Sequence, residues 1–242
     1  MGQEESHAQI INEFTSNLNT LHPQVKLSVV LIGSVARGTQ TPNSDTDLLI
    51  LGDREIHLER KSGKLHVQFM TESVFRSKLR VGDDFSAWCV RFGIPLGSSE
   101  RWVEIVSSPE AKVWPDWQNK LTHATRRLFL ASALLNSRDQ DAAAEEMRYA
   151  TSHIARAVLL KENIFPLSRP ELSQQLEETS YGKLGDILDR LIFGCVTESL
   201  LRRAQLYNKK LLLSLDRNRY RALVEERRRV FHEKSRRWQS TH

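Results

Sequence analysis

Cysteine is scarce in this sequence of 242 residues, which contains only Cys89 and Cys195. Two distant cysteines provide neither the ligand spacing of a zinc site nor the density of a disulfide scaffold, so we expect a reducing compartment. Apolar runs are short, and none approaches the ~18 residues that a membrane-spanning helix requires. The acidic N-terminus lacks the basic and apolar regions of a secretory signal. These absences predict a cytoplasmic protein without a membrane segment.

Acidic residues are few at the end of the chain. Residues 201–242 contain thirteen Lys and Arg but only four Asp and Glu, which leaves 22 basic and 26 acidic residues in positions 1–200. The segment 216–238 has the pattern of a basic amphipathic helix, which predicts binding to RNA or to an acidic protein. A solvated helix face is the alternative interpretation. The charge also disfavours polycationic aminoglycosides as substrates.

Hydrophobic periodicity divides the chain into a mixed α/β part and a helical part. It predicts strands at residues 26–32, 45–51, 64–70 and 102–106, a hairpin turn at 61–63, and helices at 7–20, 71–79 and 83–92. From Pro109 onward the pattern is helical, with breaks near 136–141, 163–170, 180–185 and 214–218. We therefore expect an α/β (α+β) domain at residues 1–107, with a small mixed sheet and helices on one face. An all-α bundle at residues 108–242 is expected to follow.

The most informative segment is residues 31–51. Its first strand ends in Gly33 and Ser34, and its second strand opens with Asp45 and Asp47. A glycine lets the backbone approach a ligand, and a serine offers a hydroxyl and an N–H group to a phosphate oxygen. Because residues two apart on a strand point to the same face, the two carboxylates are predicted to lie together. Such a pair suits a hard divalent cation, Mg²⁺ or Mn²⁺, held jointly with substrate phosphates.

This arrangement resembles the signature of the DNA polymerase β nucleotidyltransferase superfamily, in which Gly-Ser is followed by a spacer and Asp-x-Asp. The ten-residue spacer is similar to that of the minimal and the kanamycin-type aminoglycoside nucleotidyltransferases. The resemblance implies that Asp45 and Asp47 bind metal and that Gly33 and Ser34 hold the phosphates of a nucleoside triphosphate. It implies transfer of a nucleoside monophosphate to an acceptor hydroxyl. The predicted nucleotide-binding residues are completed by Arg37 and Ser44.

The third carboxylate of this superfamily has no acidic counterpart here. The superfamily supplies it from the next inward-facing strand position, where residues 64–70 offer His66 or, on the same face, Gln68. Histidine can accept a proton from a hydroxyl near neutral pH, so His66 is the predicted catalytic base. The missing acid leaves open a catalytically weakened, antitoxin-like binding or regulatory module with the same fold.

Residues 108–242 are predicted to bind the substrate or a partner, and they are similar to the HEPN-like bundles that accompany these domains. Two pairs, Arg148–His153 and Arg227–His232, fit the loose Arg-x4-His pattern of HEPN ribonucleases. Residues five apart do not share one helix face cleanly, so we attribute both pairs to chance, with a nuclease at Arg148 and His153 as the weaker alternative. The acceptor is open among a protein side chain, an RNA end and a small molecule, and the sequence favours no oligomeric state.

Overall fold

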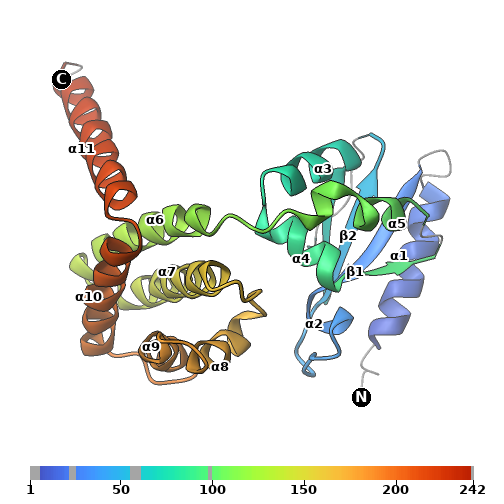
Figure 1. Ribbon diagram of the computed structural model, residues 1–242, viewed down its shortest axis with the longest axis horizontal. Coiled ribbons are helices and arrows are strands. Elements are labelled where there is room, and N and C mark those ends of the chain that lie inside the picture. The colour runs from blue at the N-terminus through green and yellow to red at the C-terminus, as the bar shows by residue number, and fades with distance from the viewer. Residues whose placement is uncertain (1–5, 22–25, 55–60, 98–99, 241–242) are drawn as a thin grey trace. The chain divides into compact units, whose positions relative to one another are not determined.

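The computed structural model describes residues 6–21, 26–54, 61–97 and 100–240, without the side chains of 19, 21, 61, 62 and 231–240. Contacts between Cα atoms divide the chain into two compact units, Met1–Asp116 and Trp117–His242 (Figure 1). The first unit combines a sheet with helices, and the second is helical. The predicted order of an α+β domain followed by an all-α region is therefore confirmed.

The sheet of the first unit has five strands in the order β3-β4-β2-β1-β5. They are β1 (Leu27–Ile32), β2 (Thr46–Gly52), β3 (Lys61–Ser62), β4 (Leu65–Thr71) and β5 (Ile94–Leu96). β2 and β4 are parallel, and the other neighbouring pairs are antiparallel, so the predicted mixed sheet is confirmed. This pairing brings the C-terminal end of β1 next to the N-terminal ends of β2 and β4, on the same side of the sheet.

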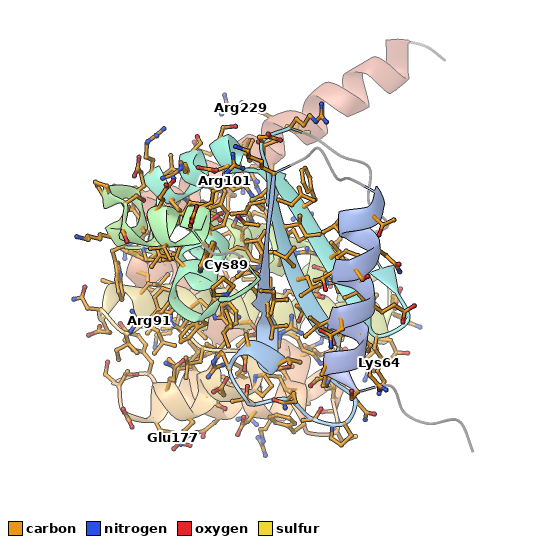
Figure 2. All side chains as sticks on the ribbon, turned by 90° about the vertical axis from the view of Figure 1, so that its right-hand side faces the viewer. Lys64, Cys89, Arg91, Arg101, Glu177 and Arg229 are labelled. Atoms are coloured by element: carbon orange, nitrogen blue, oxygen red, sulfur yellow. The ribbon has the colours of Figure 1, made fainter. Side chains whose placement is uncertain are left out.

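Helices cover both faces of this sheet, so the prediction of helices on one face is wrong. The helices of the first unit are α1 (His7–Leu21), α2 (Gly33–Ala36), α3 (Glu72–Arg80), α4 (Asp84–Phe92) and α5 (Glu100–Ser107). Helices α3, α4 and α5 pack on one face and α1 on the other. Figure 2 shows the sheet between α1 and the helices that carry Cys89 and Arg101. The apolar sequence of β2 requires this arrangement. Its four consecutive residues 48–51 are all buried, and they point alternately into the core on one face of the sheet and the core on the other.

Residues 102–106 are helical, not extended as the sequence predicts. Trp102 and Ile105 are both buried in α5, and a spacing of three residues places them on one side of a helix. The strand in this region is β5, which contains Pro95 and tolerates it at the edge of the sheet. The predicted hairpin turn shifts to residues 63–64 because Lys61 and Ser62 pair with β4. The sequence places the first arm of this hairpin at residues 54–59, of which 55–59 lie outside the described residues.

The second unit is built on two long helices with small residues between them. Its helices are α6 (Trp117–Asn136), α7 (Gln140–Lys161), α8 (Leu172–Glu177), α9 (Gly182–Ile192), α10 (Glu198–Leu215) and α11 (Arg217–Ser240). Ala131 on α6 and Ala150 on α7 are fully buried, which lets helix backbones approach closely. The predicted breaks at 136–141, 163–170 and 214–218 are confirmed. The break predicted at 180–185 lies at 178–181, and the sequence did not predict the break at 193–197. None of the described helices is long and apolar enough to cross a membrane.

Candidate active site

The corner after β1 brings the backbone of Gly33 against the side chain of Asp47. Gly33 has a φ angle of +77°, and an added Cβ would overlap Oδ2 of Asp47. The register of the two strands fixes this approach, because Ile32 lies opposite Asp47. Both the left-handed backbone and the close approach therefore require glycine at this position.

The remaining predicted nucleotide-binding residues lie in and after α2. The carbonyl of Ser34 accepts a hydrogen bond from the N–H of Arg37 at 3.2 Å. The guanidinium of Arg37 lies 5.2 Å from the centre of the Phe92 ring, a cation–π contact that orients it. The hydroxyl of Ser44 accepts a hydrogen bond from the N–H of Thr41 at 2.9 Å, which closes the loop before β2. Their roles toward a nucleotide stay predictions.

Hydrogen bonds from two other segments of the chain fix Thr46, the first residue of β2. The N–H of Thr46 donates to the carbonyl of Lys64 at 2.7 Å, and the Thr46 hydroxyl lies 2.7 Å from Nδ1 of His7. These contacts fix the strand residue between the two predicted metal ligands. Asp45 is exposed in the loop before the strand, and Asp47 is partly buried within it.

The environment of Asp47 favours a bound cation. Burial raises the pKa of Asp47, its hydrogen bond and ion pair with His66 oppose this, and the negative charge of Asp45 raises the pKa further. The ionised carboxylate is therefore poorly solvated and within reach of a second like charge. A divalent cation bound between Asp45 and Asp47 would compensate both effects, so the residues present fit such an ion.

The two aspartates do not form a complete metal site by themselves. Across the described ranges, no group of three or more His, Cys, Asp and Glu side chains is arranged to hold a metal ion. Mg²⁺ commonly binds one or two carboxylates and completes its shell with water and substrate phosphates. The pair therefore fits a metal that arrives with a triphosphate better than a permanent structural ion.

Strand β4 places His66 beside Asp47. The two residues are opposite each other in the parallel register, and Nδ1 of His66 lies 3.2 Å from Oδ1 of Asp47. The His66 side chain is 55% exposed, so it is open to an incoming group. Gln68 follows on the same face. Glu72 is instead paired with Arg76 at 2.8 Å, so it does not supply the third acid.

A cavity of about 200 Å³ adjoins the aspartate and the histidine. Its lining consists of Ile32, Gly33, Asp47, Leu48, His66, Gln68, Phe85 and Trp88. Phe85 and Trp88 lie three residues apart on α4, so they present one face to the cavity. Sequence reasoning did not identify either residue as part of the site, and helical spacing within 83–92 was the available signal. Together they add aromatic surface to a cavity that also contains Asp47, His66 and Gln68, and such a surface can stack on a planar ring.

The Arg148–His153 pair of α7 does not form a joint site. Nε of Arg148 donates to the carbonyl of Leu191 at 2.6 Å, at the end of α9. The ring of His153 instead stacks on that of His123 from α6, with 5.5 Å between centroids. The side chain of His232, in the second predicted pair, lies outside the described residues.

The buried His153 is expected to make folding sensitive to acid. Burial lowers its pKa to about 3, and the positive charges of Lys120 and His123 contribute. An unfolded histidine binds a proton below about pH 6.5, whereas folded His153 stays neutral, so stability falls as the pH decreases through this window. Between about pH 7 and pH 5 the loss is about 2 kcal/mol. Urea unfolding at both pH values should show this loss in the wild type and a smaller one in His153→Gln; equal losses would contradict a neutral His153.

One of the two matches to known proteins concerns the part of the chain that contains this site. A family model described as "Nucleotidyltransferase domain" matches residues 11–81, which include the Gly33 corner, both aspartates and His66. No curated protein matches the chain. Among solved structures, a nucleotidyltransferase-like protein from Exiguobacterium sibiricum 255-15 is 16% identical, and the similarity covers 84% of this chain and 75% of that chain, with a TM-score of 0.46. Residues 11–81 therefore match a nucleotidyltransferase domain, which supports the predicted resemblance to the DNA polymerase β superfamily.

Proposed function

We propose that the chain transfers a nucleoside monophosphate from a nucleoside triphosphate to an acceptor hydroxyl. The single observation that carries this proposal is the approach of Gly33 to Asp47, which leaves no room for any other side chain at the corner. This approach supports the proposal because backbone N–H groups at such a corner can bind phosphate oxygens, and the adjacent carboxylate fits a cation. Magnesium or manganese would be held by Asp45 and Asp47 together with the triphosphate, and would neutralise the phosphate charge.

Different residues of the site bind the triphosphate and accept the proton. Gly33, Ser34 and Arg37 hold the triphosphate, with Ser44 at the end of the same loop. The acceptor oxygen attacks the α-phosphorus, the bond from that phosphorus to the bridging oxygen breaks, and pyrophosphate leaves. His66 accepts the acceptor's proton, a role that the 55% exposure of its side chain supports.

The experiment that tests the proposal is label transfer. The purified chain is incubated with each of the four α-³²P-labelled nucleoside triphosphates, Mg²⁺ or Mn²⁺ and a cell lysate. We expect a labelled protein, RNA or small molecule that is absent with Asp45→Ala. Label transfer that persists at full rate in this variant would contradict the proposed site. Absence of transfer under every condition would favour the regulatory module without catalysis.

His66 is expected to contribute about 100-fold to the transfer rate, because general base catalysis has effects of this size. His66→Ala should lower kcat while the KM for the nucleotide changes little, and Gln68→Ala on the same face provides the matched control. If Gln68→Ala has the larger effect, His66 is not the base, and Gln68, whose amide cannot accept the proton, instead positions the substrate. Equal rates in both variants and the wild type would remove the general base from the mechanism.

We also propose that the helical unit binds the acceptor or a partner, which is the role that the sequence predicts for residues 108–242. Deleting residues 217–242 provides a first test, since α11 lies outside the family match. We expect this truncated chain to retain triphosphate binding and to lose label transfer to its natural acceptor. Loss of triphosphate binding would instead place the helix in the nucleotide site.

A further inference from the structure

A groove with cationic sides and a leucine floor lies where α10 meets α11. Its cavity measures about 430 Å³ and is lined by Leu206, Lys209, Lys210, Leu213, Ser214 and Arg217. The side chain of Leu206 is 69% exposed, although a leucine of this size gains free energy when it is covered. The groove therefore presents apolar surface that the second unit does not bury.

The described part of the chain supplies no acid that neutralises the cations of this groove. Within the side chains that the structure describes, Lys209, Lys210 and Arg217 form no ion pair. Asp216, next to Arg217 in sequence, is instead engaged by Arg219, with 3.6 Å between Nε and Oδ2. Three positive charges around one cavity raise the local concentration of anionic groups.

The positive surface continues along α11. Arg217, Arg221 and Arg228 follow each other at intervals of four and seven residues, which places them along one side of the helix. A different side faces the bundle, where the Tyr220 ring lies 6.1 Å from that of Phe129. All three arginines are exposed. Figure 1 shows the far end of α11 extending beyond the other helices of the second unit.

We propose that this groove, together with the arginine stripe of α11, binds an acidic amphipathic segment of a protein. Leucines on such a segment would cover Leu206 and Leu213, while its carboxylates would pair with the lysines and arginines that surround them. A nucleic acid would pair with the cations only. It would leave the leucines uncovered, and the described residues that line the groove include no aromatic side chain for base stacking. Charge complementarity and the apolar floor together therefore favour a protein partner.

The groove is tested with a fluorescein-labelled helical peptide in which Leu and Glu recur at helical spacing. Binding to the full chain is followed by fluorescence anisotropy. Lys209→Glu/Lys210→Glu is expected to weaken binding at least about tenfold, and Leu206→Ser about fivefold. The control Lys112→Glu/Arg126→Glu reverses two exposed charges elsewhere and should change affinity less than about twofold. A peptide with Gln in place of Glu, or Ser in place of Leu, should bind more weakly than the parent.

Three results would overturn the proposal. The first is no binding of the parent peptide to the wild type at about 1 mM, because this corresponds to only about 4 kcal/mol. The second is equal affinity in the groove variants and the control. The third is binding of labelled poly(U) RNA, but not of the peptide, that is lost in Lys209→Glu/Lys210→Glu, which would assign the surface to nucleic acid. Circular dichroism of each variant verifies that the bundle is folded.

Discussion

Replacing Asp47 by asparagine is expected to lower nucleotidyl transfer by at least about 10³-fold, because it removes the partly buried charge that faces the Gly33 corner. Asparagine keeps the shape of the side chain and a hydrogen-bonding oxygen for His66. The loss of transfer would therefore result from removal of the negative charge and not from a change in the shape of the pocket. The rate of label transfer from an α-³²P nucleoside triphosphate measures this effect.

The same substitution is expected to raise the thermal stability of the metal-free chain. Burial raises the pKa of Asp47, so its ionised form destabilises the folded state at neutral pH. Adding Mn²⁺ and a nucleoside triphosphate should raise the Tm of the wild type but not that of Asp47→Asn. Asp53→Asn, an exposed residue just after the same strand, serves as the control and should behave like the wild type. An equal ligand-induced Tm shift in Asp47→Asn would contradict the role of this carboxylate.

Gly33→Ala is expected to damage both stability and transfer. The left-handed φ angle of Gly33 disfavours alanine, and the new Cβ would overlap the Asp47 carboxylate. We expect a loss of about 2 kcal/mol or more in the free energy of unfolding. Transfer should fall about 100-fold, because a displacement of about 1 Å at reacting groups has effects of this size.

Gly97→Ala separates the effect of backbone strain from the effect of the overlap with Asp47. Gly97 has a φ angle of +78°, almost the same as Gly33, but an added Cβ there meets nothing within 4 Å. The backbone strain alone should reduce stability by about 1 kcal/mol and leave transfer unchanged. If both variants lose activity equally, the corner contact has no special role.

The core of the site could be predicted from the sequence because its parts are local. The end of β1 just before Gly33 and the beginning of β2 at Thr46, one residue after Asp45, are set by residues adjacent in the chain. The position of His66 followed from strand alternation, since the period of two places it with Gln68 on the inward face. The parallel register that sets His66 opposite Asp47 was not predictable from alternation, because it depends on how two separate strands align.

The parts that escaped prediction depend on packing between distant segments. Phe85 and Trp88 line the cavity because α4 lies over the sheet, which its periodicity alone does not reveal. Residues 102–106 are apolar at positions that either a strand or a helix could bury, and the core formed with α3 selects the helix. The helix on the second face of the sheet was also missed. The uninterrupted apolar run 48–51 was the available signal, because such a run indicates a strand that is buried on both faces.

The most direct test is a crystal structure of the chain with Mn²⁺ and a nucleoside triphosphate analogue that cannot be cleaved at the α-phosphorus. We expect an anomalous manganese peak coordinated by carboxylate oxygens of Asp45 and Asp47 and by the triphosphate, with the phosphates against the Gly33–Ser34 backbone. Manganese bound elsewhere, or a triphosphate remote from these residues while both carboxylates remain uncoordinated, would contradict it.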